Sequence, residues 1–418
     1  MNKFEIDERL LKLKEQAEID LKDIFKGVEK VCEYNSEKVL SAFVRNRVSY
    51  EDFTEINGYG FFDGGRDKIE KVFADVLGAE DALVRPHIMS GTNAIYLSLS
   101  GLLHYSDTML SITGLPYDPL QNIVGIAGNS VHSLMNNGVK YEQIELINND
   151  FDYETIKNRV SKGDVTLVEI QRSRGYSHRE GISIAQMEKV CKMIKEIDEK
   201  IIIMVDNCYG ELVEEKEPTD VGADIIAGSL MHNLGGGVAT SGGYIAGKEN
   251  LVSQIAERLT APCIAKDLGA NYNQHMKFLK GLYMAPNTVC NAIKTSIFTS
   301  YILEKLGYKG ISPKYTQRRT DIVQTFDLET EENLIKFCAG MQKASPVDSY
   351  FTPVPCEMPG YPHNEVMAAG TFTQGSTIEL TCDAPVIPPY TIYMQGSLTF
   401  EYGKLGILMA LTELIKNK

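Results

Sequence analysis

The sequence predicts an α/β fold in which a mainly parallel sheet is covered by helices on both faces. Apolar runs of strand length alternate with helical segments over much of the chain, and this alternation is typical of parallel sheets with helical crossovers. Two of the runs, residues 201–205 and 223–227, are apolar apart from Asp224, as strands buried on both faces are. Each run leads into polar residues, which would lie at the carboxyl edge of the sheet, where ligands bind in this class of fold.

The composition limits the partners and the location of the protein. A chain of 418 residues with 43% hydrophobic content can bury a large core and divide into two or three lobes. The net charge of −14 argues against nucleic acid and anionic membranes as partners. We expect no membrane span, no signal peptide and a cytoplasmic location, because no long apolar run occurs. The eight cysteines are scattered, so we expect reduced thiols and no metal site.

The expected elements follow one another along the chain. Residues 3 to about 45 carry apolar positions at helical spacing and predict an amphipathic helical arm. After a glycine-rich loop at 57–67, we expect strands at 82–85, 109–113, 143–147, 165–170, 201–205, 223–227 and 241–247, and helices at 68–77, 94–103, 118–127, 153–161 and 184–197. A loop at 262–281 and a helix at 288–306 precede a second unit, with strands expected at 321–326, 365–372 and 376–381 and helices at 334–342 and 405–415.

Polar residues next to these elements predict an anion site. Asp206 ends one apolar run, and Ser229 follows the next run. Ser90, Gly91 and Thr92 come just before a helical stretch. Small residues at a helix N-terminus let backbone N–H groups approach a phosphate, although Ser and Thr are also ordinary N-caps.

Two arginines and a glutamine stand at the end of another expected strand. Gln171, Arg172 and Arg174 follow the run at 165–170. A buried guanidinium requires an anionic partner, so these side chains are candidates for binding a substrate carboxylate or a phosphate. Structural ion pairs with acidic neighbours are the alternative interpretation.

Several long motifs in one order identify a family resemblance. Residues 58–60, 78–86, 90–92, 171–176, 344–350 and 402–406 together resemble the aluminium-resistance or methionine γ-lyase-like family of pyridoxal-phosphate (PLP) proteins, which are relatives of the cystathionine lyases. The resemblance implies a type I PLP fold with a helical arm (1–56), a large domain with a mainly parallel, seven-stranded type of sheet (57–287) and a small α+β domain (288–418). In that fold the strand expected at 241–247 runs antiparallel.

The resemblance also implies roles for the candidate residues. Asp206 would keep the pyridine nitrogen of PLP protonated, and Ser229 would bind the phosphate. The implied assembly is a homodimer or homotetramer in which Tyr59 and Arg66 reach the cofactor phosphate of the neighbouring subunit. A packed surface loop is the alternative interpretation of the stretch that holds Tyr59 and Arg66.

The chain departs from the family at two important positions. Where the family resembles Ser-Leu-x-Lys-Asn, this chain has His232, and imidazole cannot form the Schiff base that a lysine amine forms with PLP. Lys248 lies beyond the next expected strand and does not fit that role. Ile387 stands where the family resembles Pro-x-Arg-Pro-Pro-Tyr, so an arginine suited to a substrate carboxylate is missing.

Three hypotheses remain open for the activity. The chain has lost lyase activity and serves as a structural or regulatory partner, for example of an active paralogue. Alternatively, it is an enzyme in which His232, with a pKa near neutrality, moves a proton on a small amino acid joined to non-covalently held PLP. The third hypothesis is an ordinary carbon–sulfur lyase for a sulfur amino acid, if His232 is an engineered change. The two coinciding departures favour changed or lost activity.

Overall fold

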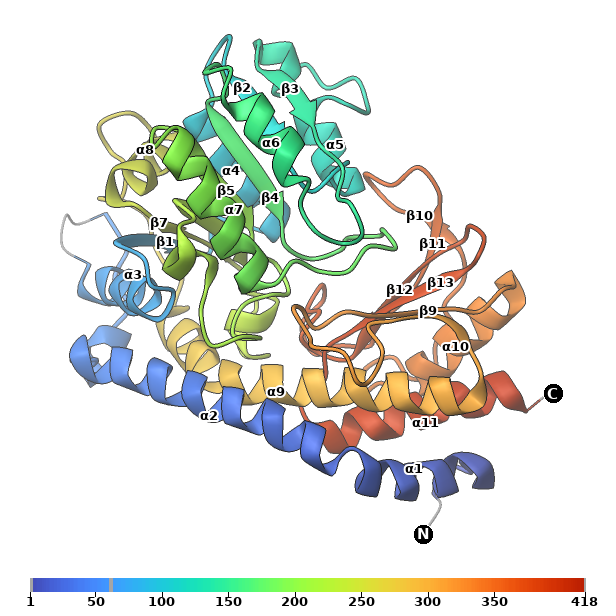
Figure 1. Cartoon of the computed structure of the whole chain (residues 1–418). Coiled ribbons are helices and arrows are strands. Elements are labelled where there is room, and N and C mark those ends of the chain that lie inside the picture. The colour runs from blue at the N-terminus through green and yellow to red at the C-terminus, as the bar shows by residue number, and fades with distance from the viewer. Residues whose placement is uncertain (1–2, 60–62, 417–418) are drawn as a thin grey trace. The chain divides into compact units, whose positions relative to one another are not determined.

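The computed structural model describes residues 3–59 and 63–416, which form two compact units (Figure 1). One unit is Asn35–Tyr283, and the other combines Met1–Tyr34 with Met284–Lys418. Two helices, α2 (Lys22–Arg45) and α9 (His275–Leu306), contribute residues to both units. In the described part of the chain, every helix is too short or too polar to span a bilayer.

The unit Asn35–Tyr283 is built on a mainly parallel sheet. Within the described residues the sheet has seven strands: β1 (Asp81–Arg85), β2 (Thr108–Ser111), β3 (Lys140–Gln143), β4 (Leu167–Gln171), β5 (Ile202–Asp206), β6 (Ile225–Ser229) and β7 (Gly243–Gly247). Their order is β1-β7-β6-β5-β4-β2-β3. Only β7 runs against its neighbours, β6 and β1. The predicted α/β fold with a mainly parallel sheet is therefore confirmed.

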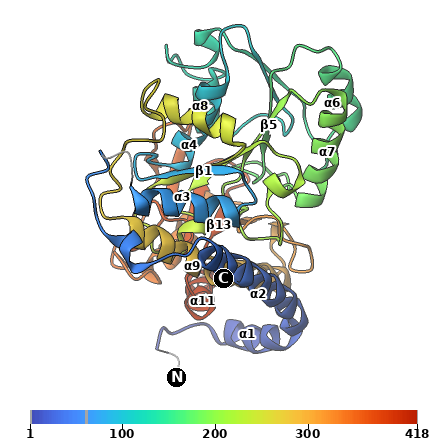
Figure 2. The same ribbon diagram turned by 90° about the vertical axis from the view of Figure 1, so that its left-hand side faces the viewer.

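Helices cover both faces of this sheet. They are α3 (Gly64–Val76), α4 (Gly91–Leu102), α5 (Asp118–Val124), α6 (Tyr153–Val160), α7 (Ile184–Ile197) and α8 (Glu249–Leu259), with 3-10 turns at Tyr50–Phe53, Met135–Asn137, Pro218–Val221 and Asn233–Gly235. Figure 2 shows α4 and α8 on one side of the sheet and α6 and α7 on the other. All five residues of β4 and of β6 are buried, which explains why these runs show no alternation of polar and apolar residues.

The strand expected at 143–147 is wrong. The structure has β3 earlier, at Lys140–Gln143, paired in parallel with Thr108–Ser111 of β2. An edge strand needs a neighbour to pair with, and β2 ends at Ser111. The chain then turns back at Asn148 and Asn149, which both adopt positive φ.

The unit that holds the C-terminus carries an antiparallel sheet. Its described strands are β8 (Lys309–Ser312), β9 (Gln324–Asp327), β10 (Cys356–Glu357), β11 (Asn364–Ala368), β12 (Thr381–Pro385) and β13 (Thr391–Gln395), in the order β10-β11-β12-β13-β9-β8. Its helices are α1 (Glu8–Asp20), α10 (Glu331–Lys343) and α11 (Phe400–Ile415). The strand expected at 376–381 is wrong, because Glu379 accepts hydrogen bonds from the backbone N–H groups of Phe372 and Thr373 and bends this segment into turns.

Candidate functional site

The candidate site lies where β4, β5 and β6 end. These strands are parallel neighbours, and Gln171 pairs in register with Asp206, which pairs with Ala227. Ser229 ends β6 two residues later. The parallel register therefore brings the residues predicted from three separate strand ends to one edge of the sheet.

Asp206 is a buried carboxylate with few partners. Its side chain is 5% exposed, and its Oδ1 accepts a hydrogen bond from the backbone N–H of Cys208 at 3.1 Å. Burial raises the pKa of Asp206 to about 6, while hydrogen bonds from Cys208 and the charge of Arg179 act in the opposite direction. At neutral pH the carboxylate is therefore largely ionised, and a nearby cation would stabilise it further.

The N-terminus of α4 packs directly on the ends of β5 and β6. A Cβ atom added to Gly91 would lie 2.8 Å from Cys208 Sγ and 3.4 Å from Ser229 Cβ, so this approach requires glycine. Ser90 caps the helix by accepting from the N–H of Asn93 at 3.1 Å. The first-turn N–H groups of a helix have no partner within it, and an anion is favoured there.

Ser229 lies beside the N-terminus of α4, next to Gly91. Its Oγ accepts from the backbone N–H of Met231 at 3.0 Å, so its hydroxyl proton can be donated elsewhere. The predicted set Ser90, Gly91, Thr92 and Ser229 is thus gathered around one helix N-terminus. Phosphate binding there stays a prediction.

Thr92, Tyr117 and Gln171 form a connected row along the edge. The hydroxyls of Thr92 and Tyr117 are 3.0 Å apart, and the backbone N–H of Tyr117 donates to Gln171 Oε1 at 3.0 Å. Gln171 Nε2 in turn donates to the carbonyl of Ser173 at 3.0 Å. In this arrangement Gln171 positions the loop that carries Tyr117.

His232 lies in the loop after β6, and its ring contacts the ring of Tyr209. The rings of His232 and Tyr209 are 4.6 Å apart at an angle of 30°. Asn233 holds the arrangement by donating to the carbonyls of Tyr209 (3.0 Å) and Glu211 (2.8 Å). Burial lowers the pKa of His232 to about 4, so the imidazole is neutral at pH 7. This value lies below the near-neutral pKa expected from the sequence, because that expectation took no account of desolvation.

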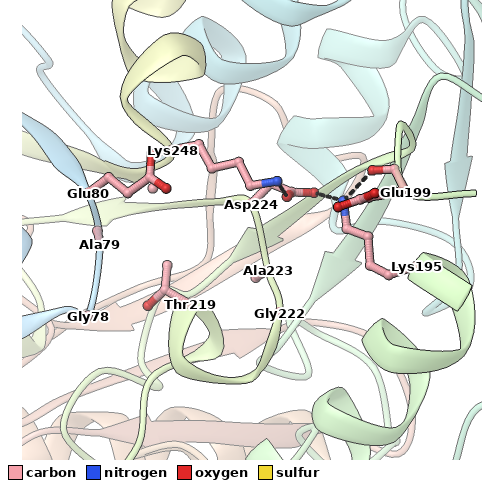
Figure 3. Close-up of a pocket in the computed structure, with 11 residues that line it drawn as sticks. Gly78, Ala79, Glu80, Lys195, Glu199, Thr219, Gly222, Ala223, Asp224 and Lys248 are labelled. Atoms are coloured by element: carbon pink, nitrogen blue, oxygen red, sulfur yellow. Dashed lines mark hydrogen bonds and ion pairs between the residues drawn. The ribbon is translucent and has the colours of Figure 1, made fainter.

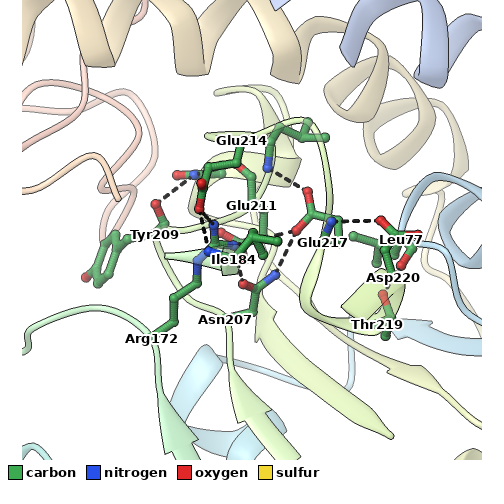
Figure 4. Close-up of polar contacts among 12 residues, drawn as sticks. Leu77, Arg172, Ile184, Asn207, Tyr209, Glu211, Glu214, Glu217, Thr219 and Asp220 are labelled. Carbon is green, nitrogen blue, oxygen red and sulfur yellow. Dashed lines mark hydrogen bonds and ion pairs between the residues drawn. The ribbon is translucent and has the colours of Figure 1, made fainter. Parts of the chain in front are cut away.

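Arg172 belongs to a buried polar network (Figure 4). It is fully buried and donates to Asn207 Oδ1 at 2.8 Å and to Glu214 Oε2 at 3.1 Å, and Glu217 Oε2 lies 3.8 Å away. Its charge is therefore balanced within the chain, as the ion-pair interpretation proposed. Arg174 is 1% exposed, and its role in substrate binding stays a prediction.

Three ionisable residues near this edge, Arg179, Glu211 and Glu169, were not predicted from the sequence. Arg179 donates to the carbonyls of Gln171 (2.7 Å) and Ser173 (2.5 Å). Glu211 is fully buried, accepts from the Tyr244 hydroxyl at 2.8 Å and has a pKa raised by burial to about 8. Glu169, on β4, is fully buried as well. The sequence does single out Glu169, because it is the one acidic residue in the mostly apolar run 165–170.

Tyr59 and Arg66 lie in and after the glycine-rich loop. Tyr59 is 76% exposed and precedes residues 60–62, which are outside the described chain. Arg66 lies in α3, is 1% exposed, and its Nε is 3.3 Å from Asp67 Oδ1. An exposed Tyr59 is accessible to a second subunit, but the cross-subunit role of both residues stays a prediction.

A hollow of about 310 Å³ lies at the opposite edge of the sheet (Figure 3). Its centre is Asp224, which pairs with Lys195 at 2.5 Å and with Lys248 at 2.8 Å. Asp224 precedes β6, whereas Ser229 ends it, and a five-residue strand spans roughly 13 Å. Lys248 is therefore held at the wrong end of β6 to replace the family lysine.

Comparisons with known proteins agree on one family. Residues 10–415 match the sequence model of the methionine γ-lyase family. The uncharacterized protein YnbB of Bacillus subtilis (strain 168) is 41% identical over 413 residues, which is 98% of each chain.

Solved structures are similar over nearly the whole chain. A carbon-sulfur lyase involved in aluminium resistance from Clostridium novyi NT has a TM-score of 0.95 and 41% identity, covering 99% of this chain and 98% of its own. A Clostridium acetobutylicum protein involved in aluminium resistance also reaches 0.95, at 46% identity, with coverage of 99% and 98%. The PLP-dependent protein YhfS of Escherichia coli, at 16% identity and a TM-score of 0.64 over 94% of this chain and 97% of its own, shows the fold alone.

Proposed function

We propose that this chain, which belongs to the methionine γ-lyase family of PLP-dependent proteins, holds PLP without a covalent bond to residue 232 and has changed or lost carbon–sulfur lyase activity. The observation that carries the proposal is His232 in the loop after β6, where the resemblance places the family lysine. An imidazole cannot supply the primary amine. Lys248, the next lysine after residue 232, is paired with Asp224 at the other end of the strand.

The residues at the strand ends fit the two groups of PLP that are bound without a covalent bond, its phosphate and its pyridine nitrogen. The first turn of α4 and the Ser229 hydroxyl offer donors for a phosphate, and Asp206 offers a carboxylate for a protonated pyridine nitrogen. When bound, PLP supplies an electron-withdrawing ring that stabilises negative charge on an attached amino acid. The chain itself positions the phosphate, orients the ring and holds the charge on Asp206.

The surroundings of His232 favour lost activity over a new role as proton carrier. A group with a pKa of about 4 holds a proton weakly at neutral pH, and the Tyr209 ring stacks on one face of the imidazole. An efficient acid or base has a pKa near the working pH. A non-catalytic role, alone or beside an active paralogue, therefore agrees better with this geometry.

The absorbance of the protein with PLP tests the proposal. We expect the wild type to release PLP on dialysis and to incorporate no PLP after borohydride treatment. His232→Lys should gain a yellow chromophore that borohydride fixes to the chain, and His232→Gln, which has no basic amine, should not. Reducible PLP in the wild type would contradict the proposal, because another lysine would then form the bond.

We also infer that the chain forms a homodimer or homotetramer. The resemblance and the exposed ring of Tyr59 support this assembly. Sedimentation at micromolar concentration measures it directly, and a monomer would contradict a site shared between subunits.

A further inference from the structure

A second carboxyl group lies beside Asp206 on the same face of the sheet. Glu169 pairs in register with Met204, and Gln171 pairs with Asp206. Side chains two residues apart on a strand share one face, as do paired neighbours in a parallel sheet. Glu169 is fully buried and makes no ion pair with Lys, Arg or His among the residues that the structure describes. The proposed function gives it no role.

The hydrogen bonds around Glu169 favour a proton on its carboxyl group. Ser111 Oγ lies 2.9 Å from Glu169 Oε2 and 3.0 Å from the carbonyl oxygen of Gly114. A carbonyl can only accept, and a serine hydroxyl has one proton to donate. If Glu169 were ionised, two acceptors would compete for that proton. If Glu169 is protonated, it donates to Ser111, and Ser111 donates to Gly114.

The second oxygen of Glu169 points to the same state. Its Oε1 is buried and has no hydrogen-bond partner. A bare anionic oxygen in a dry interior costs far more than the carbonyl oxygen of a neutral acid. Both oxygens are therefore better satisfied when Glu169 is neutral.

The hydrogen bond at Asp206 favours the ionised form, in contrast to the contacts at Glu169. Asp206 Oδ1 accepts from a backbone N–H, which stabilises an anion. The charged and titratable groups that act on Glu169 are Asp206 on β5, Tyr141 on β3 and Arg179 after β4. Burial raises the pKa of Glu169 to about 7 and the charge of Asp206 raises it further, whereas the hydrogen bond with Ser111 and the charge of Arg179 lower it. Asp206 thus ionises first, and the proton stays on Glu169.

We propose that Glu169 is a positioning residue that is protonated in mildly acidic solution, donates its proton to Ser111, and so leaves Asp206 there as the single anion of this pair that faces the pyridine nitrogen of PLP. The part that concerns PLP rests on the proposed function. The part that concerns the proton on Glu169 does not.

Infrared difference spectroscopy of the purified full-length protein without PLP tests the proton directly. At pH 6 we expect the wild type minus Glu169→Gln spectrum to contain the C=O band of a protonated carboxylic acid. Ser111→Ala should shift this band, because the hydrogen bond is lost. The control Glu211→Gln should remove a different band and leave this one. Loss of a carboxylate band in Glu169→Gln would overturn the proposal.

PLP affinity tests the coupling to Asp206. A glutamine at 169 mimics the protonated glutamate, so the dissociation constants of wild type and Glu169→Gln should agree at pH 6. At pH 8.5 only the wild type gains a second negative charge near the ring, and it should bind PLP about threefold more tightly than the variant. The ionisation of the PLP phosphate is common to both proteins and cancels in this comparison.

The outcomes of the two measurements are distinct. Affinities that stay parallel from pH 6 to pH 8.5 would overturn the coupling between Glu169 and Asp206. If neither protein binds PLP, the proposed function fails, and the infrared band still decides whether Glu169 carries a proton.

Discussion

Two buried aspartates at opposite edges of one sheet show how a structural carboxylate differs from a candidate binding carboxylate. Asp224, at the start of β6, accepts from Lys195, Lys248 and the backbone N–H of Ile203. Asp206, at the end of β5, accepts from the backbone N–H of Cys208 and has no ion-pair partner among the described residues. Burial raises its pKa to about 6. A buried charge without a cation costs stability, so the Asp206 carboxylate is best explained by a ligand.

The largest expected effect is at Asp224. Asp224→Ala should lower the free energy of unfolding by about 3 kcal/mol, because it removes the buried carboxylate that pairs with Lys195 and Lys248 and leaves the backbone N–H of Ile203 without an acceptor. Asp206→Asn, which removes a buried charge, should instead raise this free energy by about 2 kcal/mol at pH 7. Urea unfolding measures both. Equal losses would show that both aspartates are structural.

The pH dependence of stability should separate Asp206 from ordinary carboxylates. Its pKa is about 6 in the folded chain and 3.8 without the fold, so the folded state binds more protons between these values. The free energy of unfolding therefore falls as the pH rises from about 3.8 through 6 and Asp206 loses its proton. Relative to Asp206→Asn, the wild type should lose about 2 to 3 kcal/mol from pH 4 to pH 7. Parallel stability curves would contradict the raised pKa.

Gly91 tests whether the tight approach of α4 matters. Gly91→Ala should cost about 2 kcal/mol of stability and weaken PLP binding, because the added Cβ meets Cys208 Sγ. Gly27→Ala is the matched control, since Gly27 also lies in a helix but has open space around it; it should be neutral or slightly stabilising. An equal response of the two variants in urea unfolding would argue against a site built on this contact.

The smallest effect expected is on affinity. Asp206→Asn should weaken PLP binding about tenfold, because the amide lacks the charge that favours a protonated pyridine nitrogen. Asp224→Asn should leave the affinity unchanged, because Asp224 lies at the opposite edge of the sheet. Titration of PLP by fluorescence quenching measures both. An unchanged dissociation constant in Asp206→Asn would remove the main support for PLP at this edge.

Local patterns explain why much of the fold was predictable. The helix at Ile184–Ile197 is confirmed at both ends, and its start is explained by the capping box that Ser183 and Gln186 form. The strands at 143–147 and 376–381 were wrong because pairing depends on where a distant neighbour ends and on where Glu379 finds its donors. Neither the end of the neighbouring strand nor the hydrogen-bond donors of Glu379 can be read from the residues of the predicted strand itself.

The sequence by itself determined the mainly parallel sheet apart from its edge strand β3, the position of Asp206 and Ser229 at its carboxyl edge, and the imidazole at residue 232. These follow from the apolar runs and from the chemistry of single side chains. Only the tertiary structure decided that Arg172 is balanced by Glu214, that Lys248 is held at the far end of β6, and that Glu169 lies beside Asp206. In each case the partners are between 24 and 42 residues apart in the sequence, and the fold alone brings them within reach of one another.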